Sequence, residues 1–133
     1  MLTEAVLDPA IVADLRRAQD AFGNPEFIRQ LVELFQTGTP GKLDLVRDAL
    51  AAGDAATVGQ VAHALTSNCG MLGAARMAAA CARMEEAASR RDLASAAAAF
   101  QDVERDVPGV LHALSTIDPA PTSRPSSGTA RPR

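Results

Sequence analysis

Residues 54–73 read DAATVGQVAHALTSNCGMLG, and this stretch decides the fold. It opens with Asp54, which is suited to cap a helix, and it closes with Gly73, which is suited to end one. The stretch therefore predicts a helix that runs to about Met71. Four apolar residues fall within about 40° of Val58 on a helical wheel. With Val58 they form the predicted buried stripe: Val58, Ala62, Leu65, Cys69 and Leu72.

His63 falls on the opposite, solvent-facing side of this helix, about 140° from Val58. Small or polar residues surround it on the wheel: Gly59, Gln60, Thr66, Ser67 and Gly70. Each glycine inside a helix costs roughly 1 kcal/mol relative to alanine, and the chain uses alanine freely elsewhere. Two glycines here indicate a flat surface that lets another protein reach the imidazole. A lone surface histidine usually has no function, so periodicity alone leaves this role open.

The rest of the chain also shows helical periodicity. Asp8-Pro9 starts a short N-terminal helix, and Asn24-Pro25 starts the next one. Around Pro40, the segment Gly38–Gly41 either kinks that helix or divides it into two. A further helix ends near residues 89–91, and a last one follows residue 92 and bends at its proline. The pattern predicts an all-α fold, an antiparallel four-helix bundle with a short additional N-terminal helix.

Composition supports one helical domain. Hydrophobic residues make up 47% of the 133 residues, while aromatic residues make up 3%, so the core is expected to consist of Leu, Val, Ala, Met and a few Phe. We expect residues 1–115 to form the bundle. Residues 116–133 are rich in Pro, Ser, Thr and Arg with little to bury, and they are expected to form a disordered tail or a linker.

Charge and motifs exclude several classes of function. The net charge of -3 argues against a nucleic-acid partner, and no apolar run approaches the roughly 20 residues that span a bilayer. An acidic residue near the N-terminus argues against a secretory signal. Cys69 and Cys81 lack CxxC spacing and are expected to be reduced, as in a cytoplasmic protein. The chain also lacks a phosphate-binding loop and a kinase signature.

Residues 62–74, AHALTSNCGMLGA, resemble the signature of the histidine phosphotransfer (HPt) family. That signature is a histidine, a hydrophobic residue two positions later, Lys-Gly next, and a Gly-Ala or Gly-Leu pair ten residues past the histidine. Residues 79–88, AACARMEEAA, are similar to the Cys-x-x-Leu-Glu helix of the family. The helix order agrees over roughly residues 8–114.

The resemblance implies that His63 is the phosphoacceptor of a two-component phosphorelay. An exposed imidazole is substantially neutral at cellular pH, so one ring nitrogen can act as a nucleophile. The expected phosphoryl support and docking face comprises Gln60, Thr66, Ser67 and Gly70. Thr66 and Ser67 replace the lysine and glycine of the family signature. Their hydroxyls can donate hydrogen bonds that are weaker than those of a lysine.

The resemblance also implies the partners. These are response-regulator receiver domains and a hybrid sensor histidine kinase. No Asp or Glu occurs in residues 55–84 to hold Mg²⁺ near His63, so a receiver is expected to supply the aspartate and the Mg²⁺. The chain would be a monomeric, cytoplasmic phosphocarrier without a cofactor of its own, and not an enzyme. The alternative is an adaptor that binds or sequesters a receiver without phosphotransfer.

Arg76, Arg83 and Arg90 recur every seven residues and form one stripe. Such a stripe is usually a solvated helix face. The functional alternative is a docking stripe, formed by Arg76 and Arg83, that flanks the histidine and attracts an acidic receiver pocket.

Two other kinds of site are disfavoured. A metal site built from His63, His112, Cys69 and Cys81 fits no zinc spacing, and Cys69 is expected to point into the core. A hydrolase pair of Ser67 and His63 would have the required proximity, but no acid is expected to orient the histidine.

Overall fold

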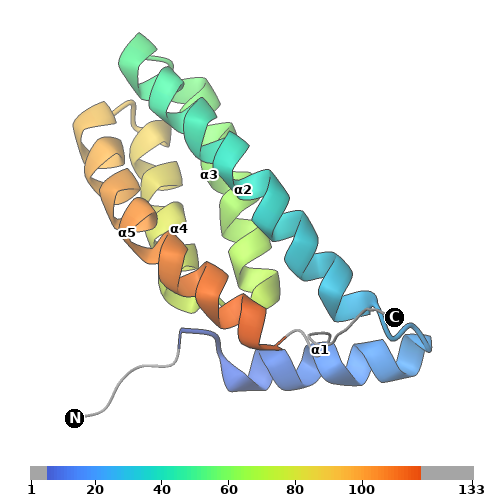
Figure 1. The fold of residues 1–133 in the computed structure, drawn as a ribbon. Coiled ribbons are helices and arrows are strands. Elements are labelled where there is room, and N and C mark those ends of the chain that lie inside the picture. The colour runs from blue at the N-terminus through green and yellow to red at the C-terminus, as the bar shows by residue number, and fades with distance from the viewer. Residues whose placement is uncertain (1–5, 118–133) are drawn as a thin grey trace.

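The computed structural model describes residues 6–117. Its elements are α1 (Pro9–Phe22), α2 (Phe27–Ala52), α3 (Ala55–Leu72), α4 (Ala75–Ser89) and α5 (Leu93–Ile117). α3 packs between α2 and α4, and α4 packs against α5. Short turns connect the successive helices from α2 to α5, which form an antiparallel bundle. α1 lies across one end of this bundle (Figure 1). The all-α prediction and the additional N-terminal helix are confirmed.

The ends of α3 follow the sequence prediction. A carboxylate oxygen of Asp54 accepts a hydrogen bond from the backbone N–H of Thr57 at 3.1 Å, as an N-cap should. The Thr57 hydroxyl also donates to the carboxylate, at 2.6 Å. The hydroxyl bond and the backbone bond together lower the pKa of the Asp54 carboxyl. Gly73 ends the helix at φ 80°, a left-handed conformation that glycine adopts without strain. Its carbonyl accepts a hydrogen bond from the Asp8 N–H at 2.7 Å, which ties the start of α1 to the end of α3.

The structure answers the question that the sequence left open at Gly38–Gly41, because α2 is one continuous helix with Pro40 inside it. The predicted start of α2 is wrong by two residues, since the helix begins at Phe27 and not at Pro25. The side chain of Asn24 instead accepts a hydrogen bond from the Glu26 N–H within the connecting turn. Gln19 of α1 accepts one from the Ile28 N–H at 2.9 Å, so a neighbouring helix caps α2.

α5 continues through Pro108 and ends at Ile117, slightly beyond the predicted boundary at residue 115. The predicted disordered tail from residue 118 onward lies outside the described residues. Within residues 6–117, no helix combines the length and hydropathy needed to cross a membrane.

The core contains the stripe predicted on α3. The side chains of this stripe are at most 3% exposed: Val58, Ala62, Leu65, Cys69 and Leu72. Inward residues of α4 pack against them, namely Met77, Ala80, Cys81, Met84, Ala87 and Ala88. Burial of the α3 stripe fixes the rotation of the helix, and this rotation leaves His63 on the outside.

Candidate functional site

His63 lies on the solvent-exposed side of α3, and its side chain is 71% exposed. Gln60, Ser67 and Gly70 are also exposed, whereas Thr66 is half-buried. The structure therefore places the predicted phosphoacceptor and docking-face residues on the outer side of one helix.

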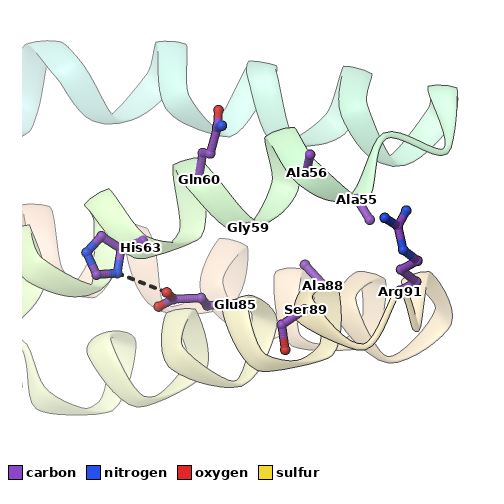
Figure 2. Close-up of a pocket in the computed structure, with 9 residues that line it drawn as sticks. All are labelled: Ala55, Ala56, Gly59, Gln60, His63, Glu85, Ala88, Ser89 and Arg91. Atoms are coloured by element: carbon purple, nitrogen blue, oxygen red, sulfur yellow. Dashed lines mark hydrogen bonds and ion pairs between the residues drawn. The ribbon is translucent and has the colours of Figure 1, made fainter.

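Glu85 of α4 contacts the histidine. One of its carboxylate oxygens, Oε2, lies 2.9 Å from Nδ1 of His63, and the Glu85 side chain is 37% exposed (Figure 2). The expectation that no acid orients the histidine is therefore wrong. Glu85 is 22 residues away in sequence, so the helical wheel of α3 could not reveal the contact. The available signal was its place at the end of the Cys81–Glu85 motif.

The contact determines which ring nitrogen is free to react. A carboxylate can only accept a hydrogen bond, so Nδ1 must carry the proton in this arrangement. The other nitrogen, Nε2, then keeps its lone pair, and it lies on the side of the ring away from Glu85 (Figure 2). In the neutral form of the ring, Nε2 is therefore the nucleophilic atom, and it is open to a partner.

A groove of about 450 Å³ runs between α3 and α4 beside the histidine. Its lining residues are mostly small: Ala55, Ala56, Gly59, Gln60, His63, Glu85, Ala88, Ser89 and Arg91. Glu85 and His63 lie at one end of the groove, and the Arg91 guanidinium lies at the other (Figure 2).

Gly59 and Gly70 leave this face of α3 without bulky side chains, although internal packing does not require a glycine at either position. A Cβ on Gly70 would meet nothing within 4 Å, and one on Gly59 would meet only the Cβ of Ala88 at an ordinary 3.6 Å. The bundle itself would therefore accept alanine at both positions. This fits the interpretation that the glycines serve a partner and not the fold.

Thr66 does not present its hydroxyl to the imidazole. Its Oγ1 donates to the backbone carbonyl of Ala62 at 2.8 Å, a bond within its own helix. Residues 55–72 also contain no Asp, Glu, Lys or Arg. α3 itself therefore places no charged side chain beside His63, and the charged contact comes from Glu85 of α4.

The arginine stripe lies toward α5. Arg83 pairs with Asp102 at 3.1 Å, and Arg76 lies 3.5 Å from Asp106. Arg83 is two residues from Glu85, so the two side chains leave opposite sides of α4. These ion pairs fit the interpretation as a solvated face, and the docking role of Arg76 and Arg83 stays a prediction.

The cysteines and His112 lie away from this face. Cys69 and Cys81 are free thiols buried between α3 and α4, and the neighbouring Cys69 thiol, together with burial, raises the pKa of Cys81. Within residues 6–117, no three His, Cys, Asp or Glu side chains are grouped so that they could hold a metal ion.

The fold and the site together define a helical bundle that presents a reactive histidine on its surface. The sequence matches the Hpt domain family over residues 30–117, and the chain belongs to that family. Its role is therefore histidine phosphotransfer in a phosphorelay.

A solved structure that resembles this chain is histidine-containing phosphotransfer protein B (HptB) from Pseudomonas aeruginosa PAO1. It is 26% identical in sequence, with a TM-score of 0.76 over 86% of this chain and 95% of that one. Comparison with curated proteins gives no significant match.

Proposed function

We propose that His63 is the phosphoacceptor, which takes a phosphoryl group from the aspartate of one receiver domain and passes it to another. The observation that carries this proposal is the contact of Nδ1 with Glu85, 2.9 Å away, on an otherwise uncharged and exposed helix face. Such a partner orients the ring and leaves the attacking nitrogen free.

In the transfer step, the lone pair of His63 Nε2 attacks the phosphorus of an aspartyl phosphate. The Nε2–P bond forms, the P–O bond to the aspartate breaks, and the aspartate leaves as a carboxylate. Nδ1 keeps its proton throughout, so the ring acquires a positive charge as the new bond forms. The Glu85 carboxylate stabilises that charge at the moment it develops. The reverse sequence of events passes the group to the next receiver.

The partner completes the site. Because α3 has no carboxylate, the receiver would supply both the aspartate and the Mg²⁺ that neutralises the phosphoryl oxygens. The chain would then be a monomeric phosphocarrier without its own ATP or metal site, supplied by a hybrid sensor histidine kinase. The two free thiols support a reducing, cytoplasmic location.

The test is transfer from a labelled phospho-receiver to the wild-type chain, to His63→Ala and to His112→Ala. His112 is an exposed histidine on α5 and serves as the matched control. The wild type and His112→Ala should both acquire a label that is acid-labile and alkali-stable, and His63→Ala should acquire none. A label that persists on His63→Ala would contradict the assignment.

A second candidate function is an adaptor that binds a receiver without taking its phosphoryl group. The observation that favours it is the Thr66 hydroxyl, which bonds to its own helix in place of the family lysine. Calorimetric titration of the same receiver distinguishes the two functions. Binding without any label would favour the adaptor, whereas binding with a His63-dependent label would exclude it.

A further inference from the structure

We propose that Glu85 and Thr66 make His63 a site that releases its phosphoryl group readily, so that the phosphorylated chain is short-lived without a receiver. This inference rests on the proposed function and deepens it. The proposed function identifies the acceptor atom, whereas the inference concerns the lifetime of the phosphohistidine and the residues that set it.

Glu85 acts through the protonation of the ring. Once Nε2 carries the phosphoryl group, the ring is positively charged only while Nδ1 keeps its proton. The carboxylate oxygen 2.9 Å from Nδ1 favours this protonated form. When the Nε2–P bond breaks, the electron pair returns to Nε2 and a neutral imidazole leaves. Without the Nδ1 proton the leaving group would be an imidazolate anion, which leaves far less readily. Glu85 thus keeps the phosphohistidine in its reactive form.

Within residues 6–117, no element next to His63 supplies a cation to hold the phosphoryl oxygens. α3 has no Lys or Arg, and Arg83 of α4 is paired with Asp102 on the side toward α5. Lys42 of α2 lines a different groove, with Asn68 and Met71. Arg91 lies at the far end of the groove from His63 (Figure 2). The added negative charge is therefore not neutralised by the described residues around His63, which favours release.

The first experiment measures the lifetime without a receiver. The full chain is loaded with phosphoramidate, a small donor whose P–N bond breaks as ammonia leaves, and the donor is then removed. Loss of the acid-labile label is followed for the wild type, Glu85→Gln and Glu86→Gln, with His63→Ala used to subtract any label on His112. Glu86 is the matched control because it loses the same charge and pairs with Arg90.

We expect the half-life of Glu85→Gln to be roughly two- to fivefold longer than that of the wild type, the range for losing a partly exposed charge pair. The wild type should also stay labile to a higher pH than Glu85→Gln, a difference that a purely structural role would not produce. Glu86→Gln should decay like the wild type. Equal half-lives for all three chains, or lengthening by Glu86→Gln alone, would overturn the role of Glu85.

The second experiment compares Thr66→Lys with Thr66→Met, two side chains of similar length of which one is charged. The lysine variant should hold its label longer than the methionine variant, and equal decay would overturn the role of Thr66. Neither experiment uses a receiver. A failure of this inference can therefore be told from a failure of the proposed function, which appears as the absence of transfer from a phospho-receiver.

Discussion

At the scale of single residues, the chemistry depends on two side chains from different helices. His63 supplies the nucleophilic nitrogen, and Glu85 decides which nitrogen that is by accepting a hydrogen bond from Nδ1–H. Glu85→Ala should lower the rate of phosphoryl acceptance by roughly five- to tenfold, the range for losing one charged hydrogen bond at a partly exposed site. The rate for Glu85→Gln should fall between those of the wild type and Glu85→Ala, because the glutamine amide oxygen can still accept a hydrogen bond from Nδ1. Stopped-flow transfer from a phospho-receiver checks the order, and equal rates for all three would contradict it.

Gly70 provides a test of the docking face. A methyl group there meets nothing within 4 Å, so Gly70→Ala should stabilise the bundle by roughly 1 kcal/mol through helix propensity alone. It should also slow phosphotransfer, because the methyl group stands on the face that the partner must approach. Gly109→Ala on α5, which is equally open, is the control that should be stabilised without any change in transfer. Urea denaturation and transfer rates are measured on both variants. Unchanged transfer by Gly70→Ala would contradict a docking role for this face.

Gly73 is required by the fold itself. It combines φ 80° with a close approach, since an added Cβ would lie 3.0 Å from the Cβ of Ile11. Gly73→Ala should therefore lower the free energy of unfolding by roughly 1–3 kcal/mol. Gly53 has a similar φ of 71°, but a Cβ added there would meet nothing within 4 Å. Gly53→Ala should therefore lower the free energy of unfolding by less. Chemical denaturation of the two variants separates backbone strain from the clash, and equal losses would show that α1 does not press on Gly73.

The sequence predicted the histidine but not its partner. The rotation of α3 follows from its apolar stripe, and that rotation alone places His63 outside. The contact with Glu85 depends on how α4 packs against α3, and a periodic pattern within one helix carries no information about that. The donation of the Thr66 hydroxyl to Ala62 was also not foreseen, because a threonine in a helix can bond either to its own backbone or outward.

At the scale of the helices, side chains at the N-termini contribute a pH-dependent part of the stability. Hydrogen bonds from Thr57 lower the pKa of Asp54 below its usual 3.8, and bonds from Ser95 lower that of Asp92 in the same way. A carboxyl group whose pKa is lower in the folded state stabilises the fold above its unfolded pKa. That contribution is lost as the pH falls through the folded value.

Asp54→Ala should accordingly lower the melting temperature by a few degrees at pH 7, and the difference from the wild type should shrink as the pH falls below about 4. At low pH, Asp54→Asn should be more stable than Asp54→Ala, because the asparagine amide oxygen can accept a hydrogen bond from Thr57 without being ionised. Thermal melts followed by circular dichroism across this range provide the measurement. A gap for Asp54→Ala that does not change with pH would show that the carboxylate charge is not involved.

The helix ends were predictable where a cap is local and not where it is supplied by another helix. Asp8, Asp54 and Gly73 act on their own helices, and all three were identified from the sequence. The start of α2 was missed because Gln19 of α1 accepts the hydrogen bond from Ile28. The effect of Pro40 could not be decided from sequence, since a proline inside a helix ends some helices and only bends others.

At the scale of the whole molecule, the bundle carries its reactive face on a helix that is almost without charge. The composition indicated helices, and the order of the apolar stripes indicated an antiparallel bundle. The position of α1 across one end was not predictable, because it depends on the close approach at Gly73 and on the bond from the Asp8 N–H to its carbonyl.

The lack of charge on α3 has a consequence for how a partner arrives. With Glu85 as the charged contact of His63 and a net charge of -3 on the chain, long-range attraction contributes little at this face. The rate of encounter should then be near the unassisted range of about 10⁵–10⁶ M⁻¹s⁻¹ and should change little when the ionic strength is raised. Stopped-flow association at several salt concentrations would reveal any strong dependence, which would refute this expectation. Discrimination among partners would then rest on how long each one stays after contact, and not on how fast it is drawn in.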